Sequence, residues 1–130
     1  MAAPNIVGVT TITGVTTTHN HSNNEIITLV NNPRGSERSY KINNISVSNI
    51  DTTNAGLVTY KHHQATGSIF GVPGAGTSIS ICNQLGIATG TTIVVTDRAS
   101  AFYLQEGECI SGQANVANLL NTIISYEIIE

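Results

Sequence analysis

Short runs of Ile, Val and Thr alternate with clusters of Gly, Asn, Asp and Pro along the whole chain. β-Branched residues favour strands, and the clusters contain the residues that end a ladder and turn the backbone. No window of about a dozen residues keeps the i, i+3, i+4, i+7 apolar spacing of an amphipathic helix. The pattern therefore predicts an all-β protein, with a single helical turn at 116–121 as the one exception.

The apolar runs place the expected strands at regular intervals, separated by turn residues. They are Ile6 to Thr13, Val15 to His19, Ile26 to Asn31, Ser39 to Ile50, Leu57 to His63, Gly67 to Phe70, Ser78 to Asn83, Thr91 to Thr96, Ala101 to Leu104, Glu108 to Gln113 and Thr122 to Ile129. Many short strands at this spacing are typical of an antiparallel β-sandwich or a jelly roll. We expect one such domain over residues 1–130.

The longest predicted strand contains a slip in its alternation. Tyr40 and Ile42 share one face, whereas Ile45 and Val47 fall in the opposite phase. A β-bulge adds one residue to a strand and so restores the phase. We predict a bulge at the two asparagines between Ile42 and Ile45.

The last predicted strand, Thr122 to Ile129, is apolar on both faces. Ile123 and Ile129 share the face opposite Ile124. An isolated sandwich would leave one of these faces half exposed, whereas a sheet centre or an interface would cover it. We therefore expect Ile123 and Ile129 to lie in a contact between copies, most readily in a homotrimer.

Residues 1–18 are also too apolar for a solvated terminus. The apolar side chains named as interface candidates in this segment are Ile6, Val7, Val9 and Ile12. One interpretation is a docking arm or an edge strand added to a neighbouring sheet. The other is the first strand of the domain's own sheet.

Charged residues make up only 10% of the 130 residues, against roughly 25% in ordinary soluble domains. The surface must then be covered by Thr, Ser and Asn, or by partner proteins. The net charge is −3, with five cations spread over the chain. Because each neutralised phosphate needs its own cation, we expect no nucleic-acid partner.

Targeting and redox signals are few. The chain has neither a secretion signal at its start nor a run of about 18 apolar residues, so we expect synthesis in a cytoplasm and no membrane partner. Cys82 and Cys109 are far apart and lack a metal or redox spacing. We expect thiols, although spacing alone leaves open whether they pair.

Glu106 and Glu108 flank Gly107 and resemble a catalytic acid pair at first sight. General acid–base work requires environments that separate the two pKa values, and the neighbouring sequence offers neither Trp nor a cation. We predict a solvated turn between two strands. With no G-x-S-x-G motif either, we expect no enzyme and no cofactor.

His19 and His21 have the spacing that would aim two imidazoles at one face of a strand, as in a zinc site. The surrounding "THNHSNNE" is rich in turn residues. We therefore favour exposed histidines in a polar loop. A small β-fold enzyme with a metal held by His19 and His21 remains the alternative.

Four segments resemble short virion structural proteins of tailed phages, particularly phages of cyanobacteria and other marine bacteria. They are "MAAPNIV" at the start, an I-x-V-x-N-x-D stretch at Ile45 to Asp51, a segment similar to xYLxEGDxI at Tyr103 to Ile110, and an ending similar to SYEEI at Ser125 to Ile128. Cys109 and Ile128 depart from these patterns. The matching motifs are structural rather than catalytic.

The resemblance implies a cement or decoration protein that binds the major capsid protein on the virion surface. A tail, neck or fibre component that binds a host surface is the alternative from the same class of particle. Six aromatic residues and no Trp argue against the glycan binding that this alternative would use.

Overall fold

The computed structural model describes residues 11–63 and 78–130. Nearly all of them belong to strands or to the turns between strands. In chain order these elements are β1 (Ile12–Asn20), β2 (Ile27–Asn31), β3 (Ser39–Asn49), β4 (Gly56–His63), β5 (Ser78–Ile87), β6 (Thr92–Thr96), the 3₁₀ turn η2 (Arg98–Ser100), β7 (Phe102–Leu104), β8 (Cys109–Ala114) and β9 (Leu120–Ile129). The all-β prediction is confirmed. None of the described residues forms a helix long enough and apolar enough to cross a membrane.

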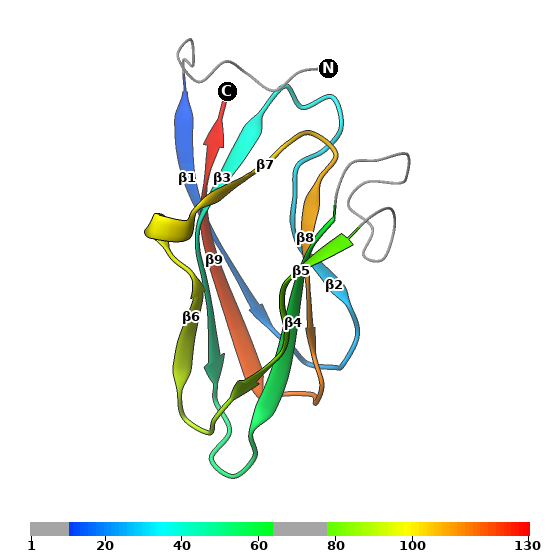
Figure 1. Ribbon diagram of the computed structural model, residues 1–130, viewed down its shortest axis with the longest axis vertical. Helices are drawn as coiled ribbons and strands as arrows, with labels where there is room; N and C mark the ends of the chain where they lie inside the picture. The colour runs from blue at the N-terminus through cyan, green and yellow to red at the C-terminus, as the bar shows by residue number, and fades with distance from the viewer. Residues whose placement is uncertain (1–10, 64–77) are drawn as a thin grey trace.

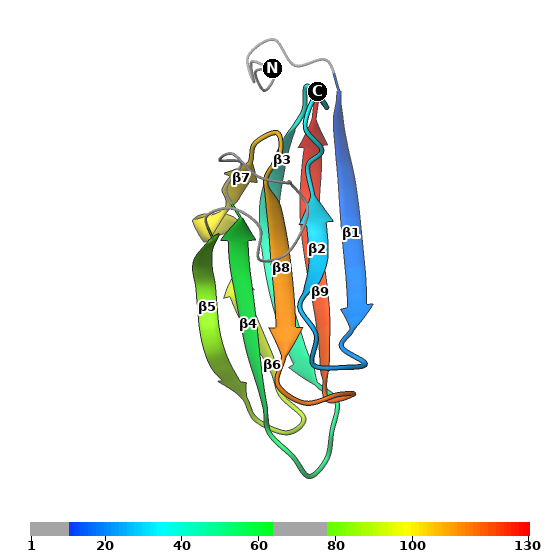
Figure 2. The same cartoon turned by 90° about the vertical axis from the view of Figure 1, so that its right-hand side faces the viewer.

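The strands form two antiparallel sheets that face each other (Figure 1). The five-stranded sheet has the order β1-β9-β3-β6, and β7 pairs with β3 beyond the end of β6. The four-stranded sheet has the order β2-β8-β4-β5, and Figure 2 shows this layer in front of the other.

The pairing is nested. β4 pairs with β5, β3 with β6, β2 with β8 and β1 with β9, so the chain forms one long hairpin whose arms are wrapped into two sheets. This strand order, with sequential strands crossing between the layers, is that of a jelly roll. The sandwich and jelly-roll prediction is therefore confirmed.

The core lies between the sheets and is built from Ile, Val, Leu and Tyr. Its largest fully buried apolar side chains are Tyr60, Ile42, Ile45, Ile87, Leu104, Ile110, Leu120 and Ile124. Ile42 and Ile45 are both fully buried because the register of β3 against β9 shifts between Ile42 and Asn44. The predicted bulge is confirmed.

Several predicted boundaries were wrong. The expected break at Gly14 is absent, because Gly14 extends the ladder and β1 is continuous over Ile12–Asn20; residues 6–10 of the first expected strand lie outside the described residues. β5 continues to Ile87, into the turn expected at 85–90, and the turn itself begins at Ala88. Residues 116–121 form a turn followed by the start of β9, not a helical turn. The strand expected at Gly67 to Phe70 lies outside the described residues.

Candidate interaction surface

The outward face of the five-stranded sheet carries the most distinctive chemistry of the described structure. Its side chains come from β1, β9, β3 and β6, and most are short and uncharged. We call this set the outer polar face; it consists of Thr16, Thr18, Asn20, Ser46, Ser48, Thr92, Val94, Asn121, Ile123 and Ser125.

Hydrogen bonds between neighbouring strands fix the short polar side chains of this face. Asn20 Nδ2 donates to Asn121 Oδ1 at 2.6 Å, which joins β1 to β9. The hydroxyls of Ser48 and Thr92 are 2.8 Å apart, which joins β3 to β6. A surface organised by such cross-strand pairs is already ordered before any partner binds.

Two apolar side chains project from the centre of this face. Ile123 lies between Thr18 and Ser46 in the ladder, and Val94 follows Ser46 on the other side. They are 42% and 54% exposed. Within the strands of this sheet, the charged side chains on this face are Glu127 and Lys41, which pair in the register near one end. Depletion of charge around exposed apolar residues is the pattern of an interface core.

The interface residues predicted from the sequence divide into three groups. Ile12 is 57% exposed on the edge strand β1, and Ile123 is exposed as expected. Ile6, Val7 and Val9 lie outside the described residues. Ile129 was expected in a contact between copies; in the single chain it is 3% exposed, because it lies between neighbours on both sides of the ladder and next to an ion pair at the strand end.

The placement of residues 12–18 bears on whether the N-terminal segment is a docking arm or the first strand of the domain's own sheet. They belong to β1, which pairs with β9 along its full length. For these residues the segment is the first strand of the domain's own sheet, and it is also an edge strand.

The prediction of two exposed histidines in a polar loop was wrong. His19 lies on β1 and is half-buried, and His21 is 1% exposed. The register places His19 opposite Thr122, on the inward side of the sheet, so the H-x-H spacing does direct both rings to one face. Their ring centroids are 4.9 Å apart in an edge-to-face arrangement.

Hydrogen bonding to buried hydroxyls explains why the polar side chain of His21 can be buried. Its Nε2 lies 2.7 Å from Thr122 Oγ1, which in turn lies 2.7 Å from the Tyr60 hydroxyl. Burial and the neighbouring His19 lower the pKa of His21 to about 4, and burial raises the pKa of Tyr60 above its usual range. Both effects favour neutral side chains within this buried chain of three groups.

No group of three or more His, Cys, Asp or Glu side chains that could hold a metal ion occurs in residues 11–63 and 78–130. Glu106 and Glu108 flank a turn with Gly107 at φ 83°, as expected. Their carboxylates are not simply solvated, however. Glu106 accepts a hydrogen bond from the backbone N–H of Glu37, and Glu108 Oε1 lies 3.4 Å from His62 Nε2.

No sequence pattern predicted the contact between His63 and Ser111. His63 Nε2 and Ser111 Oγ are 2.8 Å apart on the outward side of the four-stranded sheet. This is the hydrogen bond of a serine nucleophile and its base. The two residues are only 3% and 2% exposed, so a substrate could not reach the hydroxyl without a conformational change. Cys82 and Cys109 are thiols and are not joined as a disulfide.

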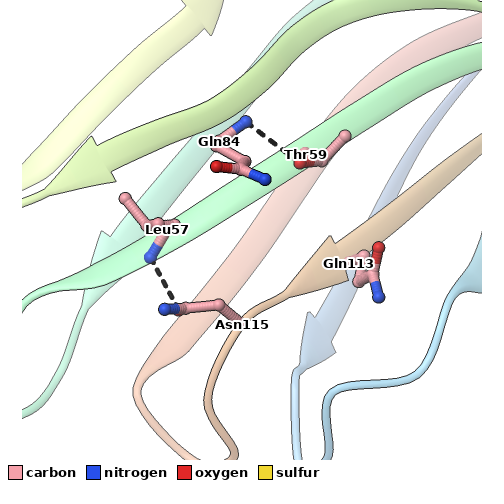
Figure 3. Close-up of a pocket in the computed structure, with 5 residues that line it drawn as sticks. All are labelled: Leu57, Thr59, Gln84, Gln113 and Asn115. Atoms are coloured by element: carbon pink, nitrogen blue, oxygen red, sulfur yellow. Dashed lines mark hydrogen bonds between the residues drawn. The ribbon is translucent and has the colours of Figure 1, made fainter.

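A hollow on the four-stranded sheet has a volume of about 180 Å³. Its lining is Leu57, Thr59, Gln84, Gln113 and Asn115 (Figure 3). Gln84 N donates to Thr59 Oγ1 at 3.0 Å, and Leu57 N donates to Asn115 Oδ1 at 2.8 Å. The lining has no titratable side chain, so it offers polar contacts but no acid–base chemistry.

A second hollow, of about 330 Å³, lies beside the outer polar face at the β1–β9 pair and is lined in part by Thr18 and Ile123. Comparison with other proteins adds no functional assignment to these features, because no protein-family model, curated protein or solved structure matches the chain.

Proposed function

We propose that the protein is a virion structural protein of a tailed phage, specifically a cement or decoration protein that binds the head lattice. The partner is the major capsid protein, and the contact surface is the outer polar face. The protein then acts by bridging neighbouring capsid subunits, without a cofactor and without a chemical reaction.

The observation that supports this proposal best is the chemistry of the outer polar face. Ile123 and Val94 are exposed among short hydroxyl and amide side chains, and the charged strand residues of this face, Lys41 and Glu127, lie near one end. Short side chains lose little rotamer freedom when a partner covers them. Such a face costs little to bury and offers both apolar area and hydrogen-bonding groups.

The size of the face favours a repeated contact over a tight single one. Four strands about 4.8 Å apart and about nine residues long give an area of roughly 600 Å². A standard interface buries about 800 Å² on each partner. One such contact is weak, but many copies on a lattice that each touch more than one subunit are stabilised by multivalency.

The fold is compatible with this role. Jelly rolls recur in viral capsid and lectin domains. This is an argument by analogy, since one fold supports many functions, and it adds to the resemblance of the four sequence segments to phage virion proteins.

A tail, neck or fibre protein that binds host glycans remains the second candidate. Sugar binding commonly uses an exposed aromatic platform. Neither of the two hollows described above has a Phe, Tyr or Trp in its lining, which favours the capsid role. A metal-dependent enzyme would be revealed by one tightly held equivalent of zinc in the purified protein.

Copy number in purified virions tests the location. A head cement protein should be present in hundreds of copies, in a fixed ratio to the major capsid protein. A few tens of copies or fewer would instead indicate a tail or neck component and would overturn the proposal.

A matched pair of variants tests the surface. Ile123→Asp places a charge at the centre of the outer polar face, whereas Ile79→Asp places one on an exposed strand residue of the other sheet. We expect the first variant to bind heads that lack the protein at least about tenfold more weakly, a change of roughly 1.4 kcal/mol, and the second to bind normally. Equal binding by both folded variants would exclude the outer polar face.

A further inference from the structure

Within the described residues, the edge of β1 presents a regular row of backbone groups that no neighbouring strand pairs. Thr11 and Glu130 exchange two hydrogen bonds of 3.0 Å, and His21 N donates to Leu120 O at 3.0 Å at the other end of the strand. These bonds fix the phase of the ladder, because inward and outward backbone groups alternate along an antiparallel strand. The N–H and C=O groups of Ile12, Gly14, Thr16, Thr18 and Asn20 therefore point away from β9.

The structure gives these outward groups almost no partner. β1 is the end strand of its sheet, and within the described residues the one backbone bond to this row is from Ser22 N to Asn20 O, at 2.9 Å. All five residues are exposed. The row is thus open to a further strand along most of β1.

β1 also lacks the devices by which proteins protect sheet edges. Such devices are short edge strands, bulges, prolines and charged side chains. Among the described edge strands, β2 and β6 have five residues each and a register shift, and the ladder of β5 shifts twice. β1 has nine residues, an unbroken register and neither Pro nor a charged Asp, Glu, Lys or Arg.

We propose that two copies of this protein pair antiparallel through β1, about a twofold axis at Thr16. Thr16 then lies opposite Thr16 of the other copy, and Gly14 lies opposite Thr18. The outward residues of the two strands exchange main-chain hydrogen bonds, and the two five-stranded sheets become one continuous sheet. This is addition of a strand to an open edge, with a second copy as the occupant.

The sequence of β1 favours a second copy as the partner. An antiparallel strand paired with itself is isologous and closes after two copies. Uncharged β1 strands do not repel each other, and a Thr–Thr pair is favourable across strands. Because the other edges are short or bulged, pairing stops at the dimer. The dimer also joins two outer polar faces into one surface of roughly 1,200 Å², at about 600 Å² for each copy.

The pairing is a dimer, in place of the trimer expected from the sequence. It depends on β1 alone and does not rest on the virion role, so it can be tested on the purified full-length chain. Sedimentation from about 1 μM to 1 mM should show a reversible monomer–dimer equilibrium. A protein that remains monomeric over this range, or one that forms trimers, would overturn the proposal.

Thr16→Lys and Thr92→Lys form a matched pair of variants. Both threonines are exposed on the outer polar face, both lie on edge strands, and each has a hydroxyl contact with a serine on the next strand. Two lysines would meet at the twofold axis only in Thr16→Lys, and like charges directly opposite are destabilising. We expect at least about a tenfold increase in the dimer dissociation constant for Thr16→Lys and none for Thr92→Lys. Equal dissociation constants would overturn the proposed interface.

Amide hydrogen exchange identifies the paired edge directly. In the monomer, the amides of Val15 and Thr17 face β9 and should exchange slowly, whereas those of Gly14, Thr16 and Thr18 should exchange fast. In the dimer, the outward amides should slow by at least about tenfold. If the outward β1 amides still exchange fast in the dimer, the two copies pair through another surface, and the proposal is contradicted. The same result is expected if the natural partner of β1 is a strand of a different protein.

Discussion

Removal of one hydroxyl from the buried chain of His21, Thr122 and Tyr60 should have an effect larger than a single hydrogen bond. Thr122 Oγ1 lies 2.7 Å from His21 Nε2 and 2.7 Å from the Tyr60 hydroxyl, and it is the one atom that both groups contact. Thr122 is 1% exposed, and Tyr60 is fully buried. Thr122→Val keeps the shape of the side chain but leaves both partners without this contact.

The magnitude follows from the number of groups left unsatisfied. Each buried polar group without a partner costs about 1–3 kcal/mol, so for two such groups we expect Thr122→Val to lower the free energy of unfolding by about 2–6 kcal/mol. Tyr60→Phe removes one end of the chain and leaves Thr122 bonded to His21, so it should cost about 1 kcal/mol. The double variant should cost less than the sum of the two, with a coupling of about 1–2 kcal/mol.

The assay is denaturant unfolding at neutral pH, followed by far-UV circular dichroism, for the wild type, the two single variants and the double variant. Thr122→Ser is the control, because it keeps the hydroxyl and loses one methyl group, at a cost of about 1 kcal/mol. Additive effects within about 0.3 kcal/mol would refute the idea that the three groups act as a connected network. If Thr122→Ser is as unstable as Thr122→Val, the loss of stability comes from lost packing and not from lost hydrogen bonds.

Two further predictions concern stability. His21 has a pKa of about 4 in the folded protein, below the usual 6.5. As the pH falls, the unfolded state therefore binds a proton before the folded state does. The contribution of His21 to the free energy of unfolding should be fully present above pH 6.5 and decline as the pH falls from 6.5 to about 4. The full shift corresponds to about 3 kcal/mol, and we expect about half of that because nearby water reduces the cost of the charge; a His21→Asn variant with the same decline in its thermal midpoint would contradict this cause. Gly112→Ala would place a Cβ 2.7 Å from Leu29 Cδ1, whereas Gly86→Ala would meet nothing closer than 3.8 Å, so urea unfolding should show a loss of about 1–3 kcal/mol for the first and less than about 0.5 kcal/mol for the second. Equal stability of the two variants would show that Leu29 moves aside without cost.

The local patterns of this chain predict its strands well because alternation is a property of neighbouring residues. The phase slip between Ile42 and Ile45 is the clearest case, since it specified a bulge before the partner strand was known. The order of strands in the sheets did not follow from the sequence, because β9 lies between β1 and β3 through contacts with residues about a hundred positions away.

The exposure of residues at the candidate sites was also mispredicted because it depends on contacts with residues far away in the sequence. His21 is polar and lies among turn residues, and only Thr122 and Tyr60, which come from other strands, make its burial favourable. Ile129 alternates in phase with Ile123, yet its neighbours across the ladder cover it. The sequence predicted that an apolar face exists on the last strand, but which of its residues stays exposed depends on how the adjacent strands end.

The nested pairing of strands has a consequence for how the chain is made. β9 is synthesised after the other described strands, yet it lies between β1 and β3, and Ile12 pairs with Ile129. The five-stranded sheet cannot form until residues 120–129 have left the ribosome, and until then both β1 and β3 lack their central partner. Folding of this sheet is therefore slow, because its defining contacts join distant parts of the sequence. During that interval the nascent chain exposes strand edges and is most prone to aggregate.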